Sequence, residues 1–222
     1  MYRAAAMIVR EYGPWPGVAQ VHGVSHDGAR VWIATGDALR ALDPASGAEV
    51  RRLRVPARAG TAFDGTYLYQ IADERIQKVD PRTGAVVATL PTPGSGCSGM
   101  AWAEGSLWVG QYRNRRIHQI DPADGKLVRT LECPRFVTGV CWVGDELWHG
   151  TMEQDHSALC RIDPASAVVL EQLDLPPGTP VSGLESDGNG TFFCGGAASG
   201  RLRAVRRRAR RDRPRADRSP TP

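Results

Sequence analysis

Few side chains in this sequence have types and spacings that could do chemistry. The titratable candidates are Glu185, His22 and an acidic segment that holds Glu153, Asp155 and His156. A carboxylate or an imidazole that is partly removed from water can gain and lose a proton near neutral pH, so general acid/base catalysis is the chemistry to consider. The acidic segment lacks the fixed ligand spacing of a metal site, so we interpret it as a solvated loop and predict no metal.

Other catalytic signatures are absent from the sequence. It contains no Gly-x-Ser-x-Gly motif, no phosphate-binding loop and no dinucleotide fingerprint, and nothing in it predicts a bound nucleotide, haem or flavin. Its five cysteines are an odd number without paired spacing or a partnered base, which argues against a disulfide framework, a zinc site and a cysteine nucleophile. We therefore expect no cofactor and a reducing, cytoplasmic location.

The composition is typical of a globular protein that can bury a core. The 222 residues are 41% hydrophobic and 23% charged. No apolar run approaches the ~20 residues of a membrane span, and the short stretch at 4–9 is too small for a signal-peptide core. We expect no membrane partner.

The formal net charge of +4 hides two opposite parts. Ten arginines and only two aspartates lie in residues 201–222, so the preceding part of the chain is mildly acidic, which is not typical of a nucleic-acid surface. We predict that the Arg/Pro-rich tail, residues 208–222, is a disordered extension. The alternatives are weak, non-specific contact of the tail with nucleic acid or an anionic surface, and an altered end that replaces a normal final turn.

Three sequence marks recur in step and predict five repeated units, spaced 37 to 45 residues apart. The first mark is an Asp-Pro pair after an apolar residue, at Asp43-Pro44, Asp80-Pro81, Asp121-Pro122 and Asp163-Pro164. The second is an aromatic position, at Trp32, Tyr69, Trp108, Trp148 and Phe193. The third is a glycine ahead of a small or apolar run, at Gly23, Gly60, Gly99, Gly139 and Gly183.

Within a unit, the apolar pattern has period two and predicts β-strands rather than helices. Segments such as 107–109, 116–120 and 126–131 are rich in β-branched and aromatic residues. The joints at 43–47, 80–84 and 121–125 place proline at a fixed negative φ and glycine where φ is positive, which is typical of tight turns. Each unit is therefore expected to form four antiparallel strands, and five such units predict an all-β, five-bladed β-propeller.

We predict one propeller domain over residues 1–207, expected to be a monomer. Its blades are placed at about 18–55, 56–92, 93–133, 134–175 and 176–207. The fifth unit has no fourth strand of its own, and residues 7–12 provide a spare one. We expect this N-terminal segment to complete the last blade, because such closure removes two open sheet edges.

The repeat places Glu185 and His22 on innermost strands, near the axis. Two positions after each glycine of the third mark stand four small side chains and one carboxylate, namely Ser25, Ala62, Ala101, Cys141 and Glu185. A lone carboxylate among small side chains should be partly desolvated, which would raise its pKa toward the range of a general acid or base. The alternatives are an arginine partner or exposure to water for Glu185, and a structural role for His22.

Function in propellers usually lies at the axis, on the face with irregular loops. The near-uniform Asp-Pro turns mark one face as structural, so we name the opposite one, which carries the second-to-third strand turns and the connections between blades, the irregular face. Gln111, Tyr112 and Arg113 lie in one of its loops and are candidates for substrate binding. Trp15 falls outside the repeat and either caps the channel mouth or wedges the first strand. We predict a small molecule or peptide as the partner, bound at the central channel.

Two segments, 99–110 and 117–131, resemble the repeats of glutamine cyclotransferase-like and streptogramin-lyase-like propellers, and the resemblance covers about residues 17–207. Five units favour the first group, because plant-type glutaminyl cyclases have five blades and streptogramin-lyase-like proteins usually seven. The resemblance implies cyclisation of an N-terminal glutamine to pyroglutamate with release of ammonia. This reaction needs a proton shuttle, and Glu185 is the inner-strand carboxylate that the chain offers for it. The alternative is a non-catalytic propeller that binds a peptide or small ligand on its irregular face. Lactone-hydrolysing calcium propellers are also similar, but the chain offers few of the Asn and Asp ligands that they need.

Overall fold

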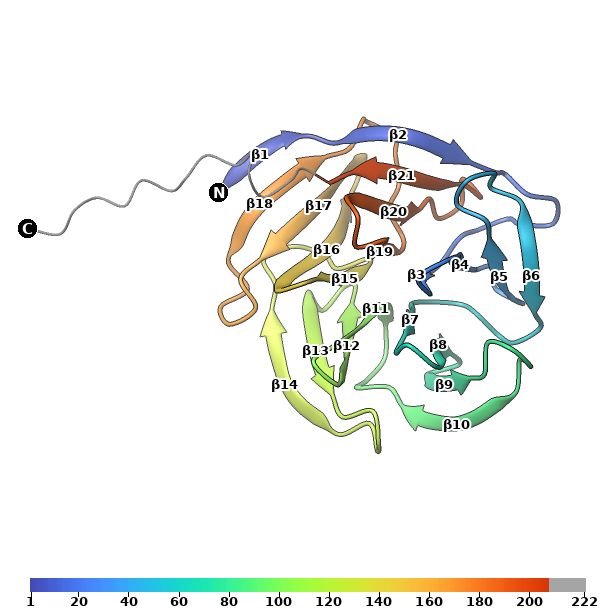
Figure 1. Cartoon of the computed structure of the whole chain (residues 1–222). Helices are drawn as coiled ribbons and strands as arrows, with labels where there is room; N and C mark the ends of the chain where they lie inside the picture. Colours follow the sequence, from blue (N-terminus) through green and yellow to red (C-terminus); the bar gives the residue numbers. More distant parts are fainter. Residues whose placement is uncertain (208–222) are drawn as a thin grey trace, which may run out of the picture.

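The computed structural model describes residues 1–207; the predicted disordered tail, residues 208–222, lies outside the described residues. All the regular structure in this part of the chain is β, arranged as five sheets around one axis (Figure 1). The prediction of an all-β, five-bladed propeller is confirmed. Residues 1–207 contain no helix of the length and apolarity required to traverse a bilayer.

Each blade is an antiparallel meander of four strands that runs from the axis outward. The first blade contains β3 (Val24–His26), β4 (Val31–Ala34), β5 (Leu39–Leu42) and β6 (Glu49–Leu53). The second contains β7 (Thr61–Phe63), β8 (Leu68–Ala72), β9 (Arg75–Val79) and β10 (Val86–Pro91). The third contains β11 (Cys97–Ala103), β12 (Ser106–Gln111), β13 (Arg116–Ile120) and β14 (Leu127–Glu132). The fourth contains β15 (Val140–Val143), β16 (Glu146–Glu153), β17 (His156–Ile162) and β18 (Val169–Asp174), and the fifth begins with β19 (Leu184–Ser186), β20 (Thr191–Gly195) and β21 (Leu202–Arg206).

The N-terminal segment closes the ring as expected. Strand β2 (Met7–Tyr12) pairs antiparallel with β21 and forms the outer strand of the fifth blade (Figure 1). A second strand, β1 (Tyr2–Ala5), pairs parallel with β18 and adds a fifth strand to the fourth blade, which the sequence analysis did not predict. Together the two strands cover sheet edges on adjacent blades, which would otherwise be open to pairing with other chains.

The Asp-Pro turns join the third and fourth strands of the blades and are held by their own aspartates. In the first blade the Asp43 carboxylate accepts a bond from the Ala45 N–H at 2.9 Å, and the Gly47 N–H donates to the Asp43 carbonyl at 2.7 Å. Gly47 has a φ of 78°, a conformation that favours glycine. These internal bonds account for the uniformity of the turns, which supports their structural interpretation.

The glycines of the third mark meet around the axis. A Cβ atom on Gly99 would lie 2.5 Å from Gly139 Cα, and one on Gly139 would lie 2.5 Å from the Leu184 nitrogen. A Cβ on Gly183 would lie 2.7 Å from the Val24 nitrogen, so the contact passes from the last blade back to the first. No side chain fits at this level, which we name the glycine ring (Gly23, Gly60, Gly99, Gly139 and Gly183).

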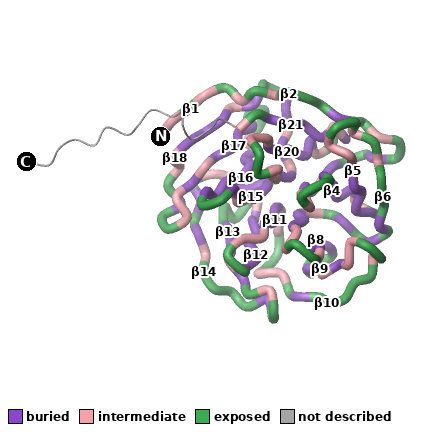
Figure 2. The backbone as a smooth tube through the Cα atoms, viewed as in Figure 1, coloured by how far each residue is buried: buried purple, intermediate pink, exposed green. Residues whose placement is uncertain are grey.

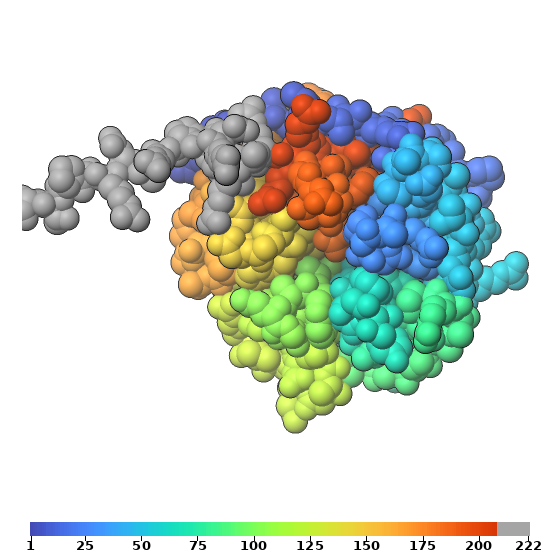
Figure 3. Space-filling model, in the orientation of Figure 1, coloured from blue at the N-terminus to red at the C-terminus, as the bar shows by residue number. Residues whose placement is uncertain are grey.

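Aromatic side chains fill the spaces between blades. Trp108 of the third blade and Trp142 of the fourth have ring centroids 5.0 Å apart, and Trp148 and Phe192 link the fourth and fifth blades at 4.9 Å. Figure 2 shows buried positions concentrated in the inner strands and exposed positions along the outer strands β6, β10 and β14. In the space-filling view the blades form sectors that meet near the centre (Figure 3).

Candidate functional site

A cavity of about 240 Å³ opens on the irregular face at the axis, and we name it the axial cavity. All five blades or the connections that lead into them contribute to its lining, which consists of Gln20, His22, Arg58, Ala59, Cys97, Ser98, Tyr112, Thr138, Met152, Val181, Ser182 and Ala197. Its volume is below the roughly 300–1,000 Å³ of pockets for drug-sized ligands. It therefore suits a very small molecule or one side chain of a longer ligand.

His22 places an imidazole in the lining of this cavity. It directly precedes the glycine ring, and its backbone N–H donates to the Ala34 carbonyl at 2.8 Å, which fixes where the side chain starts. Burial lowers the pKa of the imidazole from its usual value of 6.5, so the ring is neutral at pH 7. Within residues 1–207 the imidazole has no hydrogen-bond partner, so it can accept a proton from a bound ligand.

Hydroxyl side chains hold the same position in three other blades. The Ser98 hydroxyl donates to the Val137 carbonyl at 2.6 Å, and the Ser182 hydroxyl donates to the Val21 carbonyl, so both link neighbouring blades. The Thr138 Oγ1 atom is buried and has no hydrogen-bond partner in the described part of the chain. Thr138 is thus the hydroxyl of this set whose bonding capacity is unused.

The remaining polar groups shape the mouth of the cavity. The Tyr112 hydroxyl donates to the Met152 carbonyl at 2.9 Å, so the phenol is fixed in place. Arg58 lies exposed at the rim and pairs with the Asp73 carboxylate. Burial raises the pKa of the Cys97 thiol to about 11, so at neutral pH it is not the thiolate that a nucleophile requires.

Glu185 does not line the axial cavity. It follows Gly183 by two residues, whereas Ser182, which precedes that glycine, lines the cavity, so the glycine ring separates Glu185 from His22. The Glu185 carboxylate accepts the Ser186 N–H at 2.8 Å and the Cys141 S–H at 3.2 Å. Burial raises its pKa to about 7, and no arginine or lysine of residues 1–207 pairs with it. The desolvation that the sequence predicts for Glu185 is therefore present, but on the side of the glycine ring that faces away from the axial cavity.

The other candidates from the sequence are spread over the molecule. Gln111 is buried, and its amide binds the Ser95 carbonyl at 3.0 Å and His118 Nε2 at 2.9 Å, so the group is used internally. Arg113 is exposed and lines no part of the axial cavity. The Trp15 indole donates to the Gly47 carbonyl at 2.9 Å and packs where the fifth blade meets the first. The structure therefore brings together His22 and Tyr112.

Several lining residues were not among the site residues predicted from the sequence. Ser98, Thr138 and Ser182 occupy the position before each glycine, so the repeat places them beside His22, but it does not show that this position lines a cavity. Gln20 lies in an irregular segment and Met152 near the end of β16, where no repeat indicates that the side chain reaches the axis.

These features define the class of the protein as a five-bladed propeller with a cavity at one mouth of its axis. No protein-family model matches the chain, and no curated protein matches it. Among solved structures it is similar to the glutaminyl cyclase of Myxococcus xanthus, with a TM-score of 0.77 and 22% identity over 92% of this chain and 97% of that one. It is also similar to the β-propeller domain of Myceliophteria thermophila Cps50 (Swd1), with a TM-score of 0.58 and 8% identity over 90% and 99% of the two chains. At these identities the likeness establishes the fold.

Proposed function

We propose that the protein is a cyclase of the glutaminyl type that takes the N-terminal glutamine of a peptide into its axial cavity. The observation that carries the proposal is His22, a neutral imidazole in a cavity bounded by every blade, for which residues 1–207 provide no hydrogen-bond partner. The cavity has room for one side chain rather than a whole peptide. The fold it shares with the Myxococcus xanthus glutaminyl cyclase supports the same reaction class.

The reaction needs one proton to change places. The α-amino nitrogen of the glutamine attacks its own side-chain carboxamide carbon, and a C–N bond forms that closes the five-membered lactam. The carbon–nitrogen bond of the carboxamide then breaks, and the nitrogen leaves as ammonia. His22 takes the proton from the attacking amine and returns it to the leaving nitrogen, which balances the reaction without a co-reactant. The Arg58 guanidinium at the rim pairs with Asp73 through one N–H group, and its remaining N–H groups can donate to the oxygen that gains negative charge.

The test is turnover of a glutamine-initiated peptide, followed by ammonia release, with an alanine-initiated peptide as the control. His22→Ala should lower kcat/KM by about 100-fold or more, the usual loss for a proton-transfer group. Glu185→Gln should change kcat/KM by less than about threefold, because Glu185 lies beyond the glycine ring. The reverse result would assign the shuttle to Glu185 instead.

A non-catalytic ligand-binding propeller is the second candidate. The observation that favours it is that no Asp or Glu lines the axial cavity among the described residues. Calorimetric titration with the same peptides distinguishes the two. Saturable binding that needs His22, without ammonia release at any pH from about 5 to 9, would establish binding and reject the enzyme.

A further inference from the structure

A second, larger cavity of about 630 Å³ lies next to the axial cavity on the irregular face, and we name it the outer groove. The blade-three turn, the connection into blade four and the outer strands of blade four surround it. Three arginines, Arg3, Arg115 and Arg135, line it together with the carboxylates Glu153 and Asp174. Its volume lies within the range of sites that hold several ligand groups.

The two cavities share a wall. Met152 lines the axial cavity and Glu153 lines the outer groove, and because they are consecutive in β16 their side chains point to opposite sides. Tyr112 of the axial cavity and Phe136 of the outer groove form the rest of the wall, with ring centroids 4.9 Å apart. A chain that leaves the axial cavity over this wall reaches the outer groove within a few residues, since an extended peptide advances about 3.3 Å per residue.

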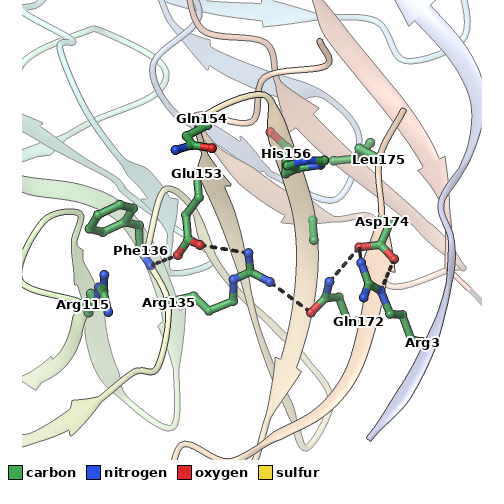
Figure 4. A pocket seen from close by; sticks show the side chains of 12 residues that line it. Arg3, Arg115, Arg135, Phe136, Glu153, Gln154, His156, Gln172, Asp174 and Leu175 are labelled. Carbon is green, nitrogen blue, oxygen red and sulfur yellow. Dashed lines mark hydrogen bonds and ion pairs between the residues drawn. The ribbon is translucent and has the colours of Figure 1, made fainter. Parts of the chain in front are cut away.

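A row of hydrogen bonds fixes the floor of the outer groove (Figure 4). The Arg135 guanidinium donates to Glu153 at 3.0 Å and to Gln172 at 3.4 Å. The Gln172 amide donates to Asp174 at 2.7 Å, and Arg3 donates to the same carboxylate at 2.6 Å. These bonds pair both carboxylates and leave Arg3 and Arg135 neutralised by their partners.

Arg115 is the arginine of the groove that forms no ion pair within residues 1–207, although its charge also helps to lower the pKa of Glu153. Its guanidinium lies 4.7 Å from the centre of the Phe136 ring, and no carboxylate of residues 1–207 lies within 4.0 Å of it. Its backbone is held on both sides, because its N–H donates to the Tyr112 carbonyl at 3.3 Å and its carbonyl accepts the Cys133 N–H at 2.6 Å. The guanidinium therefore lies beside the shared wall, where it can contact a peptide that extends from the axial cavity into the outer groove (Figure 4).

We propose that the outer groove binds the residues that follow the N-terminal one and selects an acidic side chain through Arg115. The inference rests on the proposed function for the residue that occupies the axial cavity. A carboxylate is the matching group, because the guanidinium fork binds a carboxylate through two parallel bonds. A lysine at the same peptide position would be repelled by the Arg115 guanidinium, which has no direct carboxylate partner within residues 1–207.

The test uses hexapeptides that begin with glutamine and carry one Glu, one Gln or one Lys at position two, three or four. At one of these positions the intact protein should show a kcat/KM about tenfold higher for Glu than for Lys. Arg115→Ala should reduce this ratio to less than about twofold, and Arg115→Lys should keep part of it. Arg30→Ala is the matched control, because it removes one positive charge at an exposed site outside both cavities and should leave the ratio unchanged.

A binding assay separates this inference from the proposed function. Alanine-initiated versions of the same peptides cannot cyclise, and their Kd is measured by fluorescence anisotropy. Binding of the Glu peptide that weakens about tenfold in Arg115→Ala supports the groove even where no glutamine peptide is turned over. Turnover of all glutamine peptides at equal kcat/KM, with equal binding by the Arg115→Ala variant, overturns the groove and leaves the proposed function standing.

Discussion

The two sides of the glycine ring are built from the same five strands and yet offer different environments. On the irregular face, the position before each glycine presents His22 and three hydroxyls to an open cavity. On the other side, the position two residues after each glycine packs four small side chains and Glu185, whose pKa is raised to about 7 by desolvation. A shift of three residues along the chain thus separates a ligand cavity from a desolvated carboxylate. The loops around each side, irregular on one face and uniform on the other, follow the same division.

The largest effect is expected from breaking the ring itself. Gly99→Ala places a Cβ 2.5 Å from Gly139 Cα, where only backbone could yield, so we expect a loss of about 3 kcal/mol or more in the free energy of unfolding. Gly105→Ala is the control, because a Cβ there meets no atom within 4 Å and only its φ of +68° is unfavourable, at about 1 kcal/mol. Urea unfolding measures both. Equal losses would show that the ring is not closely packed.

The pH profile of kcat/KM distinguishes the two sides, because kcat/KM reports the titration of groups in the free protein. If His22 is the base, kcat/KM should fall about tenfold per pH unit on the acid side, with a midpoint below 6.5, because burial lowers the imidazole pKa. If Glu185 is the base, the midpoint should lie near 7. Stopped assays at peptide concentrations below KM from about pH 5 to 9 give the profile, and a midpoint at 7 would assign the base to Glu185.

A smaller effect is expected on stability from Glu185 alone. Its folded-state pKa of about 7 is above the usual 4.5, so its contribution to stability is full below pH 4.5 and is lost as the pH rises through 7. Glu185→Gln should therefore be more stable than the parent at pH 8, by on the order of 2 kcal/mol, and nearly equal to it at pH 4. Thermal unfolding at both pH values provides the comparison. A variant that is less stable at pH 8 would mean that the charged carboxylate stabilises the fold.

The smallest effect is expected at the hydroxyls of the axial cavity. Thr138→Val keeps the side-chain shape and removes a buried hydroxyl that has no hydrogen-bond partner in residues 1–207, so the free energy of unfolding should rise by about 1 kcal/mol. Ser98→Ala removes a hydroxyl that donates to Val137 and should lower the stability by a similar amount. The denaturant midpoint should therefore rise in Thr138→Val and fall in Ser98→Ala. Parallel shifts would contradict the bonding described for the two side chains.

The fold could be predicted from the sequence because its signals are local and repeated. The period-two strands, the Asp-Pro turns and the unpaired fifth unit each follow from residues close together in the chain. Strand β1 escaped prediction because Tyr2–Ala5 is short and its partner, β18, is distant in sequence and runs parallel.

The candidate site could be predicted only in part. The repeat places His22 and Glu185 on inner strands, but the side of the glycine ring on which each lies depends on three-dimensional packing. The bond between Gln111 and His118 does not follow from the sequence either, because the two residues are diagonal across the β12–β13 hairpin, where Gln111 pairs with Arg116 and His118 with Val109. The loop position of Arg115 depends on turn geometry that no repeat encodes.

The seam between β2 and β21 also governs the order in which the molecule can be assembled. Met7–Tyr12 leaves the ribosome nearly two hundred residues before its partner, Leu202–Arg206. Strand β2 therefore has no β21 to pair with until the last blade has been synthesised, and only then can the ring of blades close. A circularly permuted gene that starts in the Asp64–Thr66 turn would encode β21 and β2 one after the other. The two strands could then pair soon after β2 is synthesised.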